Sequence, residues 1–392
     1  MKPLLPLLIL PLLLGPTSFS QEPASPSQKV GPSAIEMPSK KTLQQALNRA
    51  TEFLLQTQNP DGSWGLPTRT KNLNIYAPIP GSHHAFRTAT TALCMVGLTD
   101  ISSSNPEVVR ALSRAENWMI QHLPRLRRAT PAAIYNIWGH AYAIQALVRI
   151  HRGGAQGERK TTLEKLIRLQ IDLLTRYESV DGGWGYYDFE IGAQKPGSSS
   201  TSFATATILV ALHEAEAIGI DSPPKLIRRA IASLHRQQKP DFSYIYGEYL
   251  KHYPVAPINR PGGSLARSQA CNVALRLWGD RRITDGVIET WLDRLFARNG
   301  WLAIGRKRPV PHETWFAVSG YFYHYGHYYA RICIELLPAD KQEAYWAHQS
   351  QVLLALQEKD GSFWDYPLYN YHQQYGTGYT LMSLAPALKY AR

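Results

Sequence analysis

The sequence predicts an all-α fold, an (α/α)6 toroid in which six outer helices alternate with six inner ones. Two observations support this prediction. A short turn motif recurs at intervals of about 60 residues, and each copy separates an amphipathic segment from a segment that is apolar on nearly every side. A fixed period of this length indicates a repeat architecture, and helices that are apolar all round are buried ones. Such helices are expected to form an inner ring inside an outer ring.

The turn motif is clearest at Asp61, where the sequence reads Asp-Gly-Ser-Trp-Gly, and at Asp181, where it reads Asp-Gly-Gly-Trp-Gly. A third copy at Asp360 reads Asp-Gly-Ser-Phe-Trp, with one residue added before the tryptophan. Weaker copies begin at Asp241 and Asn299, and the copy expected near position 121 is missing. Because glycine tolerates the left-handed backbone that a helix end or tight turn needs, each copy predicts the end of a helix.

The segments on either side of these turns define the helices. Apolar residues recur at helical spacing from Leu43 to Leu54, ahead of the first turn, and from Leu163 to Leu174, ahead of the second. These amphipathic stretches predict outer helices. Small and apolar residues predict the inner helices over residues 88–98, 139–150, 202–212, 268–277, 325–337 and 376–388.

The first forty residues lie outside the repeats. A lysine, an apolar run of about eleven residues and small residues before a cleavage site near Ser20 predict a signal peptide at residues 1–20. The apolar run is too short to span a bilayer. Residues 21–40 are rich in proline, serine and glutamine, which predicts a disordered lead, and the toroid is expected over residues 41–392. We therefore expect an exported chain, either periplasmic or secreted.

The formal net charge of +12 raises the question of a nucleic-acid partner. The basic residues come in short separated groups, such as those at 125–128 and 306–308, and no signature of a nucleic-acid-binding domain accompanies them. We therefore expect solvated outer faces and no nucleic-acid partner. A basic exterior does favour peripheral contact with an anionic envelope surface.

Alignment of the first turns of the inner helices gives one equivalent position in each repeat. Its residues are Thr88, His140, Thr205, Cys271, His327 and Thr377. If this layer faces the centre of the ring, His140, Cys271 and His327 share one cavity, and imidazole with thiolate suits zinc. All ligand atoms must lie within about 2.0–2.3 Å of one metal ion, and residues on helices spaced around a wide ring do not easily come that close together. Packing residues with satisfied hydrogen bonds are the favoured interpretation, and zinc is the weaker alternative.

The densest polar and aromatic stretch runs from Pro311 to Tyr329, at the entry of a predicted inner helix. So many tyrosines and histidines cost desolvation unless they are hydrogen-bonded or reach water, which predicts the wall of a pocket. The cavity-lining candidates are Arg87, His140, Arg267, Cys271, His312, Trp315, Tyr321, Tyr325 and Tyr379. The catalytic candidates are Asp188, Glu248, Tyr323, His324 and His327. For each of these carboxylates taken alone, a structural role in a turn or helix cap is more frequent than a catalytic role.

The turn from Gln58 to Gly65, which reads Gln-Asn-Pro-Asp-Gly-Ser-Trp-Gly, is followed by a buried helix of small residues. This combination resembles the repeats of the prenyltransferase and squalene cyclase superfamily, over the chain from about Thr42 to Ala391. The resemblance implies a single α/α toroid whose repeat turns brace the outer helices. The tryptophans that it assigns to this structural role are Trp64, Trp184, Trp301 and Trp364.

The resemblance also implies an apolar or isoprenoid-like ligand, but the superfamily's chemistry depends on motifs that this sequence lacks. The acid motifs of the triterpene cyclases, Asp-x-Asp-Asp and Asp-Cys-Thr-Ala-Glu, do not occur. At the zinc site of the protein prenyltransferases, Cys271 would match the cysteine, whereas Gln269 replaces the aspartate and Gly376 or Thr377 the histidine. Terpenoid cyclase or transferase chemistry therefore stays open.

Three hypotheses follow. An exported toroid that binds an apolar or isoprenoid-like ligand predicts a deep apolar pocket. A polysaccharide lyase or hydrolase predicts an open cleft with a carboxylate near the tyrosines and histidines, and a non-enzymatic interaction scaffold predicts a filled cavity. A diphosphate on the ligand would lie at the N-terminal ends of the inner helices, whose dipoles favour anions. The side chains that would add positive charge there are His83, His84, Arg87 and Arg267.

Overall fold

A computed structural model describes residues 32–71, 81–101, 105–188, 195–197 and 200–392. The predicted signal peptide and the predicted lead up to residue 31 lie outside these ranges. Within them the chain is helical, with isolated bridges and no strand. The inner helices are α2 (His83–Ile101), α4 (Asn136–Arg152), α6 (Ser202–Glu216), α8 (Leu265–Leu277), α11 (Phe322–Glu335) and α13 (His372–Leu384). The outer helices are α1 (Lys40–Gln56), α3 (Pro106–His122), α5 (Gly157–Arg176), α7 (Pro224–Gln237), α9 (Asp285–Ala297) and α12 (Ala339–Leu354).

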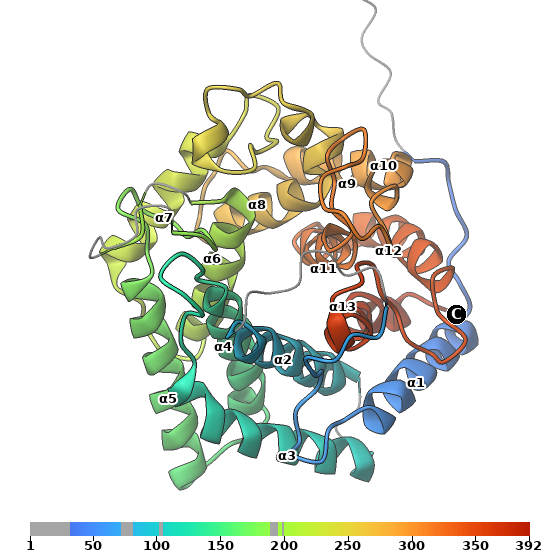
Figure 1. Cartoon of the computed structure of the whole chain (residues 1–392). Coiled ribbons are helices and arrows are strands. Elements are labelled where there is room, and N and C mark those ends of the chain that lie inside the picture. The colour runs from blue at the N-terminus through green and yellow to red at the C-terminus, as the bar shows by residue number, and fades with distance from the viewer. Residues whose placement is uncertain (1–31, 72–80, 102–104, 189–194, 198–199) are drawn as a thin grey trace, which may run out of the picture. The chain divides into compact units, whose positions relative to one another are not determined.

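The inner helices of residues 32–392 form a closed ring (Figure 1). Each packs against its two neighbours in the order α2, α4, α6, α8, α11 and α13, and α13 packs back against α2. The outer helices lie around this ring, each against an inner helix. The ends of the ring also meet, because the main-chain N–H of Lys40 donates to the carbonyl of Arg392 at 2.8 Å. The predicted toroid of alternating inner and outer helices is confirmed.

The burial pattern explains why each segment takes its place. In α7 the buried positions include Ile227, Ala230 and Leu234, which lie three or four residues apart and so share one face. In α6 every residue from Ser202 to Leu212 is buried. An amphipathic helix can cover the ring, whereas a helix that is buried on all sides must lie within it.

The repeat turns brace the outer helices through a buried indole. The Trp64 indole N–H donates to the carbonyl of Leu54 at 2.7 Å, and that of Trp184 donates to the carbonyl of Leu174 at 2.8 Å. The main-chain N–H of Trp184 donates to Thr205 Oγ1 at 3.0 Å, which ties the turn to the inner helix α6. The expected structural role of these two tryptophans is confirmed.

The later copies of the turn differ from the expectation. In the copy at Asp360, Phe363 takes the position of the buried tryptophan, since its N–H donates to Thr377 Oγ1 at 3.0 Å. Trp364 instead lies beneath the ammonium group of Lys307, 4.5 Å from its ring centre. Trp301 belongs to a short helix, α10 (Asn299–Ala303), so the weak copy predicted there is not a turn.

The remaining connections include short 3₁₀ turns. They are η1 (Leu123–Arg125), η2 (Glu248–Leu250), η3 (Pro257–Asn259), η4 (Gly262–Ser264), η5 (Tyr369–Tyr371) and η6 (Ala385–Lys389). The end of the predicted lead is packed: Gln351 Nε2 on α12 donates to the carbonyl of Glu36, and Met37 contacts the core. Among the described residues, no helix is both long enough and apolar enough to cross a membrane.

Candidate active site in an aromatic cavity

A cavity of about 490 Å³ lies at the N-terminal ends of the inner helices. Its aromatic lining consists of Phe86, Tyr135, Trp138, Tyr142, Tyr186, Tyr187, Phe203, Tyr321, Phe322, Tyr325, Tyr366, Tyr375 and Tyr379. The other lining residues are Ala89, Thr90, Leu93, Pro311, His312 and Leu368. No aspartate, glutamate, lysine or arginine of the described ranges lines it, so the wall carries no fixed charge.

The cavity runs down the ring axis from loops to helices. Tyr187, His312 and Tyr366 come from loops that precede inner helices, whereas Tyr142 and Leu93 lie well inside theirs. Phe86 and Leu93 both line the cavity and stand seven residues apart on α2, which corresponds to about 10 Å along the helix axis. The loops therefore form the mouth and the tyrosines of the helix interiors form the floor.

The waist of the cavity is a layer of rings supplied by different inner helices. Trp138 of α4 stacks on Phe203 of α6, with ring centres 5.8 Å apart and planes 20° apart. Phe203 also meets Phe322 of α11 edge to face, at 5.0 Å and 80°. Aromatic pairs in these arrangements gain more stabilisation than their burial alone provides, and the layer presents ring faces and edges to the cavity.

Hydroxyl groups surround the mouth and bond to one another. Tyr135 pairs with Tyr187, and Tyr186 pairs with Tyr246, which lies behind the lining. Tyr321 bonds through its hydroxyl to His312 Nε2 at 3.2 Å. Burial lowers the pKa of His312, although the Ala317 carbonyl opposes this effect, so the imidazole is neutral at neutral pH.

A carboxyl group lies directly behind the wall. Asp365 is fully buried, and its Oδ1 accepts a hydrogen bond from the hydroxyl of the cavity-lining Tyr375 at 2.7 Å. Its Oδ2 accepts from the main-chain N–H of His324 at 2.9 Å. Burial raises the pKa of Asp365 to about 6, against the opposing effects of these two hydrogen bonds and of Arg306. Asp365 therefore exchanges a proton close to neutral pH, one residue removed from the cavity.

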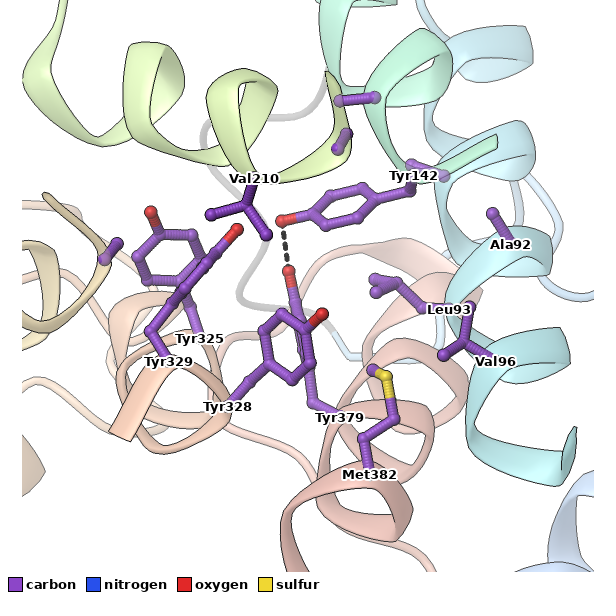
Figure 2. Close-up of a cluster of buried hydrophobic side chains, with 14 of the residues drawn as sticks. Ala92, Leu93, Val96, Tyr142, Val210, Tyr325, Tyr328, Tyr329, Tyr379 and Met382 are labelled. Carbon is purple, nitrogen blue, oxygen red and sulfur yellow. Dashed lines mark hydrogen bonds between the residues drawn. The ribbon is translucent and has the colours of Figure 1, made fainter. Parts of the chain in front are cut away.

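Figure 2 shows the floor, where tyrosines of α4, α11 and α13 meet among apolar side chains. The hydroxyl of Tyr379 on α13 donates to that of Tyr142 on α4. Tyr325, Tyr328 and Tyr329 approach from α11. Val210, Leu93, Val96 and Met382 enclose the group.

The structure places some predicted cavity residues in the lining and others elsewhere. The predicted candidates that line the cavity are His312, Tyr321, Tyr325 and Tyr379. Trp315 is 74% exposed and does not line it. Arg87 forms an ion pair with Asp61 of the first repeat turn, 2.6 Å apart.

Arg267 lies behind the mouth and does not reach it. Its guanidinium donates to the main-chain carbonyls of Tyr244, Ile258 and Gly263. The group stands 5.7 Å from the ring centre of Tyr246, and burial lowers its pKa to about 10. Neither Arg267 nor Arg87 supplies a charge for a diphosphate at the cavity surface, because both are held by other partners.

The two histidines of the layer proposed as a zinc site face away from the ring axis. His140 Nδ1 bonds to Gln170 Oε1 on the outer helix α5 at 2.7 Å, and His327 Nε2 bonds to Asn299 Nδ2 on α10 at 2.9 Å. Cys271 is a buried free thiol whose pKa burial raises. No three His, Cys, Asp or Glu side chains of the described residues are grouped to hold a metal. The expectation that His140, Cys271 and His327 share a cavity is therefore corrected.

The predicted catalytic residues are buried outside the lining. Tyr323 donates its hydroxyl to Asn299 Oδ1 at 2.8 Å, and His324, whose pKa burial lowers to about 3, contacts Thr380 Oγ1 at 3.1 Å. Glu248 accepts from Arg236 at 2.6 Å, which fixes a loop. Asp188 accepts from the main-chain N–H of Gly197 at 3.3 Å. His327, the remaining candidate, faces α10.

Sequence reasoning did not select most of the wall, although a signal was present. In the alignment of first turns, the residue two positions before the outward-facing layer is aromatic in most repeats. These residues are Phe86, Trp138, Phe203, Tyr325 and Tyr375, and all of them line the cavity. Two residues along a helix correspond to a rotation of about 200°, so the two columns face opposite sides.

The fold and the cavity together define a single-ring α/α toroid with a neutral, aromatic cavity. The family model of the squalene-hopene cyclase C-terminal domain matches residues 29–254, more than half of the chain. The chain belongs to this family. No curated protein matches its sequence.

Solved structures share the fold at low sequence identity. The type II terpene cyclase MstE from Scytonema matches with a TM-score of 0.52 and 16% identity, over 90% of this chain and 100% of that one. An inactive variant of the α-1,6-mannanase GH76A of Salegentibacter, in complex with α-1,6-mannotriose, has a TM-score of 0.56 and 9% identity, over 88% and 99%. A D-mannose isomerase has a TM-score of 0.54 and 12% identity, over 90% and 99%.

Proposed function

We propose that this protein binds an apolar, isoprenoid-like ligand in the aromatic cavity. The observation that supports this proposal most directly is the cavity itself. It encloses about 490 Å³, aromatic rings of inner helices line it, and no charged side chain of the described residues does. Sites for small molecules are typically of this size and largely apolar. Membership of the squalene-hopene cyclase C-terminal domain family supports the same ligand class. A variant of MstE has been solved with its substrate, geranylgeranyl dihydroxybenzoate.

Two alternatives have less support. A polysaccharide hydrolase needs a pair of carboxylates that flank the scissile bond, and no described carboxylate lines this cavity. An interaction scaffold with a vestigial pocket predicts a filled centre, whereas the cavity here is open. The mannanase and the isomerase share the toroid at 12% identity or less, and similarity at this level supports a common fold but no common substrate.

The test is a binding experiment that separates the ligand classes. The chain from Gln21 onward would be titrated with geranylgeraniol and, separately, with α-1,6-mannotriose, and the heat of binding measured. Ala89 lines the cavity and is nearly buried, so the indole of Ala89→Trp would occupy ligand space. We expect geranylgeraniol to bind and Ala89→Trp to weaken binding at least about tenfold, which corresponds to about 1.4 kcal/mol.

The exposed Trp315 supplies a matched control, because Trp315→Ala alters an aromatic residue outside the cavity. This variant should bind geranylgeraniol as the wild type does. Binding of mannotriose in place of the isoprenoid, or unchanged binding by a folded Ala89→Trp variant, would refute the proposal.

We further propose proton-initiated chemistry on this ligand, because Asp365, whose pKa burial raises to about 6, is hydrogen-bonded to the Tyr375 hydroxyl. When Asp365 is protonated this bond reverses, so that Asp365 donates to the Tyr375 oxygen and the Tyr375 hydrogen is free to turn toward the ligand. The proton of Asp365 passes to the Tyr375 oxygen while the Tyr375 hydrogen passes to a double bond or an oxygen of the ligand. Ring faces of the wall stabilise the resulting cation. A proton then returns by the same route, so the product is an isomer and no co-reactant is consumed. Asp365→Asn and Tyr375→Phe should bind the ligand but form no isomer, as gas chromatography of the extracted ligand would show by the absence of a second peak of the same mass.

A further inference from the structure

The floor of the cavity holds a cluster of hydroxyl groups that the apolar wall does not explain. Tyr329 donates to Thr207 Oγ1 at 3.0 Å, and Tyr325 lies 3.1 Å from the same oxygen. Tyr379 donates to Tyr142 in the same region (Figure 2). We call the hydroxyls of Tyr142, Thr207, Tyr325, Tyr329 and Tyr379 the floor cluster. Helices α4, α6, α11 and α13 all contribute to it.

Each of these side chains could be a phenylalanine or a valine if the floor only had to be filled. A buried hydroxyl costs desolvation unless it is bonded, and the cluster meets this cost through mutual hydrogen bonds. Burial raises the pKa of Tyr142, Tyr325, Tyr329 and Tyr379, so these groups are neutral phenols. The floor is therefore polar but uncharged, below a waist that is apolar.

The balance of donors and acceptors in the cluster is uneven. A hydroxyl carries one hydrogen and two lone pairs, so a closed group of hydroxyls has more acceptor capacity than donor capacity. Tyr325 donates to the carbonyl of Phe203 at 3.1 Å, which uses a hydrogen and none of the lone pairs. Tyr379 donates to Tyr142, and no hydrogen bond between described residues is donated to its hydroxyl oxygen. The surplus at the floor is a surplus of acceptors.

This surplus is accessible to a ligand, because Tyr142, Tyr325 and Tyr379 all line the cavity. We propose that the ligand enters the cavity with a hydroxyl group leading and that the floor cluster binds this group. The ligand hydroxyl donates its hydrogen to the hydroxyl oxygen of Tyr379. The ligand class is thus an isoprenoid alcohol or phenol that enters with its hydroxyl end leading. This inference rests on the proposed function, since it concerns the same cavity.

A matched pair of ligands isolates the hydrogen that the cluster would accept. Farnesol carries a terminal hydroxyl, and farnesyl methyl ether keeps the oxygen and the chain but lacks the hydrogen. Binding would be measured by quenching of tryptophan fluorescence, since Trp138 lines the cavity. A neutral hydrogen bond predicts that farnesol binds between about twofold and tenfold more tightly than its ether.

The protein variants locate that preference. Tyr142→Phe combined with Tyr379→Phe removes both hydroxyls of one pair, so no partner is left unbonded, and it should abolish the preference for farnesol. Two controls keep the floor cluster intact. Tyr187→Phe removes a hydroxyl at the mouth, and Tyr328→Phe removes one that bonds to Gln145 outside the lining. Both should retain the preference.

The outcomes are distinct. Equal binding of farnesol and its ether by the wild type, or a preference that survives in the floor variant, would overturn the proposed subsite. A preference lost in Tyr187→Phe instead would place the hydroxyl at the mouth and would also overturn it. If neither ligand binds to the folded wild type, the proposed function itself fails. Circular dichroism would show that each variant is folded.

Discussion

Replacement of Asp365 by asparagine tests whether a titrating acid stands behind the cavity wall. Asp365 is fully buried, and the pKa of its carboxyl is raised from 3.8 to about 6, mainly by burial. In the unfolded chain it would ionise near pH 4. Between these pH values the folded state binds more protons than the unfolded state, so stability decreases as the pH rises. A shift of roughly two pKa units corresponds to about 3 kcal/mol lost between pH 4 and pH 7.

Asparagine copies the protonated form of this group. Its carbonyl can accept from the His324 N–H and its amide can donate to the Tyr375 hydroxyl, as a neutral carboxylic acid would. Asp365→Asn should therefore match the wild type in stability near pH 4 and exceed it by up to about 3 kcal/mol at pH 7. Urea denaturation at the two pH values gives both free energies of unfolding.

Asp360 provides the control in the same turn. Burial opposes its ionisation, but the hydroxyl and N–H of Ser362 outweigh that effect, and the pKa of Asp360 is lowered. A lowered pKa stabilises the fold at neutral pH, and this contribution is lost as the pH falls, so Asp360→Asn should depend on pH in the opposite sense. If Asp365→Asn shifts stability equally at both pH values, the carboxyl does not titrate as argued.

Two predictions concern the repeat turns. Trp184→Phe removes the indole hydrogen bond to the Leu174 carbonyl, which keeps its bond from the Tyr177 N–H, and should lower the free energy of unfolding by about 0.5–1.5 kcal/mol; an unchanged urea midpoint would contradict the bracing role. Gly361→Ala should cost more than about 1 kcal/mol, because the residue has φ +88° and an added Cβ would lie 2.5 Å from the carbonyl oxygen of Arg49. Gly300→Ala, with open space around it, is the control, and equal thermal shifts in the two alanine variants would be inconsistent with this argument.

The fold was predictable because its signals are local and repeated. The Asp-Gly turn fixes where an outer helix ends, and its glycine meets the next outer helix: a Cβ added to Gly62, Gly182 or Gly361 would lie 2.5 Å from a main-chain oxygen of α3, α7 or α1. Only glycine fits such a contact, so the Asp-Gly motif is found in each repeat whose turn packs this closely against the next outer helix. The period and the burial pattern then determine the toroid.

The site was less predictable from the sequence. Aligning one residue from each inner helix does not show whether that residue points toward the ring axis or away from it, because this depends on how each helix is rotated about its own axis. The aligned layer could have faced the centre, yet two of its members, Thr205 and Thr377, accept hydrogen bonds from the repeat turns on the outer side. In the first repeat that role belongs to Thr91 and not to Thr88, a shift of three residues. The mouth was harder still, because Tyr187 and Tyr366 lie in loops without periodicity, positioned by tertiary contacts.

The positions of the buried charges explain why tyrosine rather than phenylalanine dominates the wall. Arg267 stands behind Tyr246, which itself lies behind the lining, and Asp365 stands behind Tyr375, so each charge is separated from the cavity by at least one phenol. A charge at the surface of an apolar site would hold water and repel the ligand. A phenol presents a ring to the ligand and a hydroxyl to the polar group behind it. The wall can thus remain neutral toward an apolar ligand and still pass a proton, which a layer of phenylalanines could not do.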